Sequence, residues 1–230
     1  MTRILIHVEG QTEEVFVNEI LRDHLVRIGY KSVSARIVGN ARLQRGGIRR
    51  WPSVRKGIIN HLKEDSGCIA TTMVDYYGLP HGKNGGWPGR AEASGLKSGA
   101  STKASFVENA LRGDLADAMG KGFDNSRFIP FVVMHEFEAL LFSDCAAFSS
   151  GIGRPNLAEE FTRVRNEFDT PEEINDSPDT APSKRVGAIV PGYEKPLLGT
   201  LAILEIGLQR IRQECPHFND WLGRLEQQAG

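Results

Sequence analysis

The fold is decided by the stretch Ile4-Leu5-Ile6-His7-Val8-Glu9-Gly10-Gln11-Thr12-Glu13-Glu14. A short apolar run that stops at an acidic residue followed by glycine is typical of a buried strand that ends in a carboxylate. Thr12 supplies a capping hydroxyl and the next two residues supply first-turn acids, so a helix is predicted to begin there. Ligands of open α/β sheets bind where strands end and helices begin. We therefore expect Glu9 at the functional edge of a sheet, with Glu13 pointing back at the same place.

Two further apolar runs end in acidic residues. The run 68–74, Cys-Ile-Ala-Thr-Thr-Met-Val, stops at Asp75, and the run 127–134 leads into His135-Glu136-Phe137-Glu138. Parallel strands that each end in an acid place those acids at one edge of the sheet, so we expect Glu9 and Asp75 to lie close together. Glu136 and Glu138 share a face if the strand continues through them, but not if a helix begins there.

The rest of the chain alternates between strand and helix patterns. Helical spacing of apolar residues covers 13–30, 52–64 and 101–119, and a strand pattern covers 33–38. In the last third, helical patterns at 156–168, 197–213 and 217–228 surround the segment 186–190, which fits either strand or helix. This order predicts an α/β fold with a mostly parallel central sheet flanked by helices and a C-terminal helical extension. We expect an α/β core at 1–150 and a mainly helical part at 151–230 packed on it, together one compact domain.

The composition is that of an ordinary soluble globular protein. The 230 residues are 40% apolar and 25% charged, and the formal net charge of −1 argues against a generic cationic coat for nucleic acid. No apolar run approaches the length of a membrane span, and the first residues show a strand pattern rather than a signal peptide. Cys68, Cys145 and Cys215 are scattered without metal-ligand spacing. We therefore expect reduced thiols and a cytoplasmic protein.

Basic residues gather in two glycine-containing segments. The segment from Lys31 to Lys56 has no Asp or Glu among its Lys and Arg residues, and it can track a phosphate backbone while Trp51 stacks on a base. The loop 82–90 contains a tryptophan and lacks the Gly-Lys-Ser/Thr ending of a P-loop, and it can act as a lid. The alternatives are a solvated basic loop and a disordered loop. The candidate phosphate-binding residues in these segments are Arg42, Arg45, Arg49, Arg50, Lys83 and Arg90.

Four stretches in order resemble a family of small, uncharacterised bacterial proteins of Toprim-like type. They are Val8-Glu-Gly-Gln-Thr-Glu-Glu14, Val74-Asp-Tyr-Tyr-Gly-Leu-Pro80, His135-Glu-Phe-Glu-Ala-Leu-Leu-Phe-Ser-Asp144 and Pro182-Ser-Lys-Arg185, and they span nearly the whole chain. Toprim domains are the Mg²⁺-dependent phosphoryl-transfer modules of topoisomerases, primases and OLD-type (overcoming lysogenization defect) nucleases. The resemblance therefore implies a Toprim-like fold and divalent-metal chemistry.

The resemblance also implies roles for individual residues. Glu9 matches the first glutamate of Toprim domains, a metal ligand or general base. Asp75 matches the first aspartate of an Asp-x-Asp pair, whose second position is Tyr77 here. Glu9 and Glu13 have the Glu-x-x-x-Glu spacing of OLD-type nucleases. Those nucleases also use a late lysine near the scissile phosphate, for which Lys184 is the candidate, the alternative being a solvated cation.

The strand-end acids form a candidate metal site. Clusters of carboxylate oxygens hold Mg²⁺ or Mn²⁺, and two such ions activate a water and stabilise the leaving oxygen of a phosphodiester. Any one of these acids alone is more often a cap or a surface acid, and a first-turn glutamate also complements the helix dipole. Three strand ends with acids, together with the resemblance, favour the metal site. His135 is either a ligand or a hydrogen-bonded structural residue. The candidate metal ligands are Glu9, Glu13, Asp75, Glu136 and Glu138.

Three functions fit these observations. The first is a metal-dependent nuclease with catalytic Glu9, Asp75 and Lys184, in which Lys184 or Arg185 neutralises the developing charge. By resemblance, such a domain works on nucleic acid beside a separate ATPase subunit in an anti-phage or other mobile-element defence system. The second is a binding or regulatory subunit that has lost turnover, which Tyr77 favours. The third is hydrolysis of a small phosphorylated molecule held by the arginine-rich loop.

Overall fold

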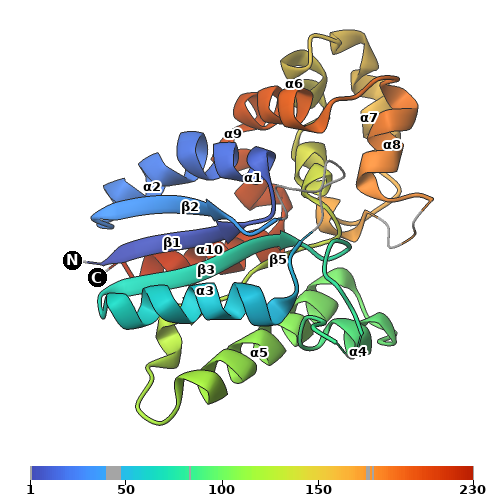
Figure 1. Cartoon of the computed structure of the whole chain (residues 1–230). Coiled ribbons are helices and arrows are strands. Elements are labelled where there is room, and N and C mark those ends of the chain that lie inside the picture. Colours follow the sequence, from blue (N-terminus) through green and yellow to red (C-terminus); the bar gives the residue numbers. More distant parts are fainter. Residues whose placement is uncertain (1, 40–47, 83, 175–176, 178, 230) are drawn as a thin grey trace.

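The computed structural model describes residues 2–229 apart from 40–47, 83, 175–176 and 178, and it contains a parallel sheet between layers of helices (Figure 1). The strands are β1 (Arg3–Val8), β2 (Ser32–Ile37), β3 (Cys68–Asp75), β4 (Phe128–Ile129) and β5 (Val132–Val133). Their order is β2-β1-β3-β4, with β5 also paired to β3, and each of these pairings is parallel. The α/β fold with a mostly parallel central sheet is confirmed.

The register of the central strands brings two acids to one edge of the sheet. Val8, the last residue of β1, pairs with Met73 of β3. Glu9, the residue after β1, therefore lies next to the end of β3, where Asp75 is the last residue. The backbone N–H of Asp75 donates a hydrogen bond to Oε2 of Glu9 at 3.2 Å. The expectation that these two strands end side by side is confirmed.

The third apolar run is not one strand. Instead of a strand over 127–134, the chain forms β4 and β5 on either side of Pro130, which has no N–H to donate to the ladder. The hydroxyl of Thr72 bridges the break, because it donates to the carbonyl of Phe131 at 2.9 Å and accepts from the amide of Phe131 at 3.0 Å. The hydroxyl of Thr71 donates to the carbonyl of Ile129. Both buried threonines of β3 are thus hydrogen-bonded.

Helices cover both faces of the sheet (Figure 1). One face is covered by α1 (Gln11–Phe16), a π-helical segment (Val17–Leu21), α2 (Arg22–Arg27) and α10 (Pro216–Gln227). The other face is covered by α3 (Trp51–Glu64) and α5 (Ala100–Met119). Side chains of β3 alternate between the two hydrophobic clusters, with Ile69 and Met73 in the first and Ala70 and Val74 in the second.

The C-terminal helices form a lobe beside the carboxyl edge of the sheet (Figure 1). They include α6 (Cys145–Gly151), α7 (Ala158–Arg165), α8 (Pro182–Ile189) and α9 (Thr200–Glu214), and a short helix, α4 (Arg90–Ser94), precedes α5. The segment 186–190, which fits either strand or helix in the sequence, lies largely within α8. Gly207 interrupts α9 with φ 73° and ψ 161°, a conformation that other residues rarely adopt. The C-terminal helical extension is confirmed.

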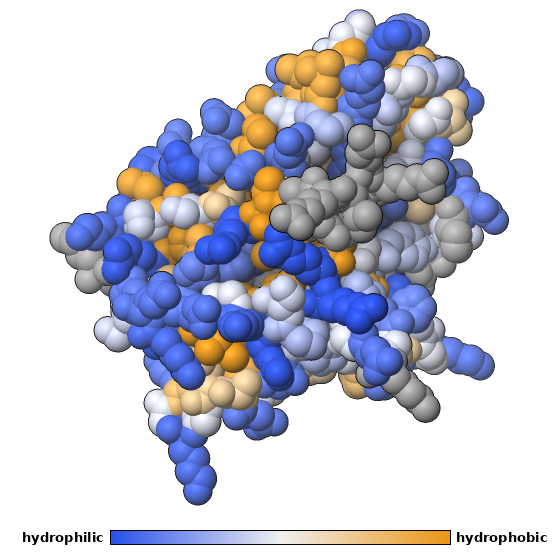
Figure 2. All heavy atoms as spheres, viewed as in Figure 1, coloured by the Kyte–Doolittle hydropathy of each residue, from blue (hydrophilic) through white to orange (hydrophobic). Residues whose placement is uncertain are grey.

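Hydrophilic side chains cover most of the face in Figure 2, and apolar atoms gather at its upper end, over α6 and α9. Leu197, Leu201 and Leu204 are among the exposed large apolar side chains, and their spacing of four and three residues places them on one side of a helix. Cys68, Cys145 and Cys215 are free thiols. In the part of the chain that the structure describes, no helix is long and apolar enough to cross a membrane.

Candidate active site

Backbone groups fix the carboxylates of Glu9 and Asp75. Oδ1 of Asp75 accepts a hydrogen bond from the backbone N–H of Phe137 at 2.9 Å, while the amide of Asp75 donates to Glu9. Gly78 faces the Glu9 carboxylate so closely that a β-carbon there would lie 2.7 Å from Oε2. At Gly39, a β-carbon would lie 2.3 Å from the carbonyl oxygen of Glu9. Two glycines therefore allow the chain to enclose the end of β1.

Glu13 and Glu138 join these residues in a group of buried acids. Glu13, on the first turn of α1, accepts a hydrogen bond from the backbone N–H of Gly10 at 2.9 Å. Glu138 lies in the 3₁₀ helix Phe137–Ser143, and the exposed fractions of Glu13 and Glu138 are 2% and 1%. We call Glu9, Glu13, Asp75 and Glu138 the acid cluster.

Of the two acids after the third apolar run, only Glu138 belongs to the acid cluster. Glu136 accepts a hydrogen bond from the backbone N–H of Ser183 at 2.8 Å, at the start of α8. The reason is that residues 137–143 are helical rather than extended, so the side chains of positions 136 and 138 do not share a face. The placement of Glu136 among the metal ligands is therefore not what the structure shows.

Lys195 is the cation of the acid cluster. Its Nζ lies 3.1 Å from Oε2 of Glu138, 3.3 Å from Oδ2 of Asp75 and 3.5 Å from Oε1 of Glu13. Lys195 opens the π-helical segment Lys195–Gly199 that precedes α9, and its side chain is 36% exposed. One face of the ammonium thus meets three carboxylates while part of the side chain stays in contact with solvent.

Burial and repulsion from neighbouring carboxylates raise the pKa values of Glu9, Asp75 and Glu138. Burial, followed by the charge of Glu13, raises the pKa of Glu9 to about 7. Burial also raises the pKa of Asp75 well above its usual value and raises the pKa of Glu138, although Lys195 opposes both shifts. Burial lowers the pKa of Lys195, but Asp75, Glu138 and Glu13 outweigh burial and hold that pKa well above its ordinary range. Perturbed groups of this kind are common at functional sites.

The Glu9 pKa predicts how stability depends on pH in the metal-free protein. Since its pKa rises from 4.5 to about 7 on folding, the contribution of Glu9 is fully present below pH 4.5 and is lost as the pH rises through 7. We expect the unfolding free energy to fall by about 1–2 kcal/mol across this window, because partial solvent contact weakens the full effect. Urea unfolding with a chelator at pH 5 and pH 8 measures it. Glu9→Gln should reduce this pH dependence, since Asp75 and Glu138 still contribute in the same direction, whereas an undiminished dependence in that variant would assign it to the other acids alone.

The donor chemistry of the acid cluster fits a hard divalent cation. Oε1 of Glu13 and both carboxylate oxygens of Glu138 are buried, and apart from the ion pairs with Lys195 they accept no hydrogen bond from the described residues. Oxygen atoms of this kind are the ligands that Mg²⁺ and Mn²⁺ prefer. Within the described ranges, however, no three His, Cys, Asp or Glu side chains are already arranged as a metal cage. Three of the carboxylates do surround a positive charge, but that charge is the ammonium of Lys195 and not a metal ion.

The late-lysine candidate lies elsewhere. Lys184 is an exposed residue of α8, and its backbone N–H donates to the carbonyl of Ala181 at 2.9 Å. Lys195 contacts the acids instead, and sequence reasoning missed it because its partners lie 57 to 182 positions earlier in the chain. No local motif marks it. His135 is buried and its Nδ1 lies 2.9 Å from the carbonyl oxygen of Ile174, which supports its structural interpretation.

Several of the basic residues predicted to bind phosphate have other partners. Arg90 is buried, donates to the carbonyl of Tyr76 at 2.8 Å and stacks over the Tyr76 ring. Arg185 forms an ion pair with Glu167 at 2.8 Å and donates to the carbonyl of Thr180 at 3.0 Å. Both guanidinium groups are thus engaged by groups of the fold, and phosphate binding by these two arginines stays a prediction.

The basic segment before α3 passes close to the acid cluster. Gly39, which packs against Glu9, forms an antiparallel bridge with Ile48, and the exposed Arg49 and Arg50 follow directly. Trp51 is buried, and its Nε1 donates to Asp114 at 2.6 Å, so it is not available to stack on a base. Arg42, Arg45 and Lys83 lie outside the described residues.

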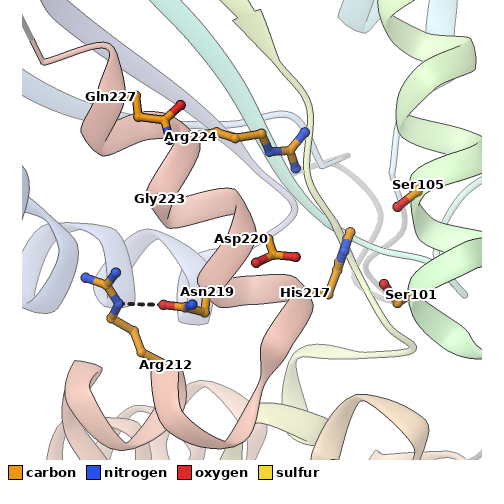
Figure 3. A pocket seen from close by; sticks show the side chains of 9 residues that line it. All are labelled: Ser101, Ser105, Arg212, His217, Asn219, Asp220, Gly223, Arg224 and Gln227. Atoms are coloured by element: carbon orange, nitrogen blue, oxygen red, sulfur yellow. Dashed lines mark hydrogen bonds between the residues drawn. The ribbon is translucent and has the colours of Figure 1, made fainter.

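Apart from the acid cluster, a polar pocket lies between α5 and α10 (Figure 3). Its volume is about 490 Å³, and its lining side chains include Ser101, His217, Asp220 and Arg224. His217 is buried and pairs with Glu108, whose Oε1 is 2.8 Å from His217 Nε2. The charged side chains of its lining are Arg212, Arg224 and one carboxylate, Asp220.

Comparison with known proteins gives a family and one structural likeness. A family model described as "Domain of unknown function (DUF4276)" matches residues 8–226. No curated protein matches the chain. Among solved structures, the C-terminal region of the OLD protein of Xanthomonas campestris pv. campestris is similar, with a TM-score of 0.44 and 13% identity over 100% of this chain and 96% of that chain. A likeness at this level gives no argument about the activity of the chain.

Proposed function

The chain belongs to the DUF4276 family of unknown function, and we propose that it is a divalent-metal-dependent phosphoryl-transfer enzyme, a nuclease that hydrolyses phosphodiester bonds. The acid cluster is the observation that supports this proposal. It joins four carboxylates and one lysine at the carboxyl edge of a parallel sheet, where open α/β proteins bind their ligands. Burying several carboxylates costs free energy, so a purely structural role is a poor explanation for them.

In this proposal Glu9, Glu13, Asp75 and Glu138 hold Mg²⁺ or Mn²⁺. The bound metal supplies a more acidic water and neutralises charge on the phosphate. The carboxylate of Glu9, which accepts a hydrogen bond from the amide of Asp75, can hold the metal or orient its bound water. Lys195 places a positive charge at the site, where it can stabilise negative charge that develops on phosphate oxygens.

The position of the basic segment supports nucleic acid as the substrate. Arg49 and Arg50 are exposed and follow the bridge between Gly39 and Ile48, which lies against Glu9. Arginine side chains beside a metal site can hold the phosphates that flank the scissile bond. A separate ATPase subunit and a role in phage defence are proposals that rest on the sequence resemblance alone.

Metal binding and cleavage test the proposal together. We expect Asp75→Asn and Glu138→Gln to weaken Mn²⁺ binding at least tenfold in calorimetry and to abolish Mn²⁺-dependent cleavage of supercoiled plasmid and of single-stranded DNA or RNA. Glu136→Gln is the matched control, because Glu136 is bonded to Ser183 and lies outside the acid cluster. It should bind Mn²⁺ within about twofold of wild type, since the metal ligands are intact.

One observation favours a second function, a binding or regulatory subunit without turnover. Lys195 already pairs with three of the acids, and Tyr77 occupies the position at which the resemblance implies a second aspartate. If the wild-type protein binds no Mn²⁺, or binds it without cleaving any of the three substrates, this second function replaces the first. An effect of Glu136→Gln as large as that of Glu138→Gln would contradict the assignment of the ligands.

A further inference from the structure

The hydroxyl of Tyr193 is a buried polar group without a hydrogen-bond partner among the described residues. Tyr193 lies in the turn between α8 and Lys195, and its backbone N–H donates to the carbonyl of Val190 at 3.1 Å. Leaving a buried hydroxyl unpaired costs about 1–3 kcal/mol. A phenylalanine at this position would fill the same space without that cost, so the oxygen atom itself calls for an explanation.

The surroundings place this hydroxyl near the start of α1, the helix that carries Glu13. A β-carbon on Gly199 would lie 2.8 Å from the Tyr193 oxygen and 3.5 Å from Cγ2 of Thr12, at the start of α1. Burial, and then the charge of Glu138, raise the pKa of Tyr193, with Lys195 opposing them. The phenol therefore keeps its proton at neutral pH and is available as a donor.

Carboxylate oxygens of the acid cluster are also short of hydrogen-bond donors. Oε1 of Glu13 and both oxygens of Glu138 are buried, and among the described residues the ammonium of Lys195 is their partner, at 3.5 Å from Oε1 of Glu13 and 3.1 Å from Oε2 of Glu138. All of these atoms are acceptors, whereas the Tyr193 hydroxyl is a neutral donor. A site in which several carboxylates share one ammonium and a phenol is left unpaired fits a ligand made of a cation and an oxyanion. The carboxylates suit the cation, and the phenol suits an oxygen of the anion.

We propose that the Tyr193 hydroxyl is a substrate-binding group, which donates a hydrogen bond to a non-bridging oxygen of the phosphate bound at the acid cluster. This inference rests on the proposed phosphoryl-transfer function and adds a residue to it. The turn that carries Lys195 thereby supplies two groups to the phosphate, one charged and one neutral. The absence of a side chain at Gly199 leaves room for the phenol, since a β-carbon there would lie 2.8 Å from the hydroxyl oxygen.

Tyr193→Phe tests the inference because it removes a single oxygen atom. The probes are Mn²⁺ alone and then inorganic phosphate added to the Mn²⁺-loaded protein, both followed by calorimetry. We expect Mn²⁺ affinity within about twofold of wild type and phosphate affinity about tenfold weaker, as for one hydrogen bond to a charged group. The melting temperature should stay the same or rise, because an unsatisfied buried group is removed.

Tyr30→Phe is the control, since the Tyr30 hydroxyl is also buried but donates to the carbonyl of Leu225 at 2.8 Å. It should lower the melting temperature and leave phosphate affinity unchanged. The inference is overturned if Tyr193→Phe binds phosphate as wild type does, or if it loses Mn²⁺ and phosphate affinity in parallel. If the wild-type protein binds phosphate through Tyr193 but does not bind Mn²⁺, the proposed function is refuted and the inference about Tyr193 still holds. A wild-type protein that binds neither probe would refute both.

Discussion

Replacing Lys195 with methionine should lower the unfolding free energy by about 3 kcal/mol at pH 8 and reduce cleavage about 100- to 1000-fold. The variant leaves Glu13, Asp75 and Glu138 buried together without the ammonium that now lies within 3.5 Å of each. Removing one partner of buried charges typically costs 3–5 kcal/mol. The lower end applies here because the lysine side chain is 36% exposed and solvent screens part of its charge.

The loss in Lys195→Met should depend on pH. The pKa values of Asp75 and Glu138 are already raised by burial, and without Lys195 they rise further. A carboxyl group whose pKa is raised on folding contributes stability that is lost as the pH rises through the folded-state pKa. The variant should therefore resemble wild type more closely at pH 5 than at pH 8.

Urea unfolding at both pH values, in the presence of a chelator, measures this effect. Lys184→Met is the matched control, because that lysine is exposed on α8, and it should change the unfolding free energy by less than about 0.5 kcal/mol. Equal losses in the two variants, or a loss in Lys195→Met that does not grow with pH, would contradict the assignment of Lys195 as the cation of the acid cluster.

The second large effect is expected at Glu108, on the opposite face of the sheet from the start of α1. Glu108→Ala should lower the unfolding free energy by about 3–5 kcal/mol. The carboxylate is buried, with Oε1 accepting from the amide of Val132 at 2.9 Å and lying 2.8 Å from Nε2 of His217. Arg224 lies 3.5 Å from Oε2. The alanine variant leaves a buried histidine and a buried backbone N–H without their acceptor.

Glu108→Gln separates the hydrogen bond from the charge. Its amide oxygen can still accept from Val132, so we expect about half of the loss seen in the alanine variant. Burial lowers the pKa of His217, but hydrogen bonding to Glu108 and its charge outweigh burial and raise it. The stability that protonated His217 gains from Glu108 is therefore fully present below pH 6.5, and it is lost as the pH rises through the raised pKa of His217. Urea unfolding between pH 5 and pH 9 should show this loss in wild type but not in Glu108→Gln, and a loss of equal size in both would refute the pairing.

The sequence by itself determined the α/β architecture and the first part of the site. Apolar runs that end in acids predicted β1 and β3, and parallel strands necessarily bring such ends to one edge, so Glu9 and Asp75 could be placed together without coordinates. Glu13 could be placed with them because it lies in the first turn of the helix that begins directly after Glu9 and Gly10. These features depend on residues that are close together in the sequence, so the spacing of apolar and acidic residues is enough to predict them.

Only the tertiary structure decided which other groups meet these acids. Lys195 rather than Lys184 reaches them, because the chain between α8 and α9 returns to the sheet edge after passing through the helical lobe. Glu138 rather than Glu136 faces them, because a 3₁₀ helix begins at the point where an extended strand would have kept both on one side. Arg90 and Arg185 turned out to bind backbone carbonyls of the fold. Contacts between residues far apart in the chain depend on packing, and packing leaves no periodic signal in the sequence.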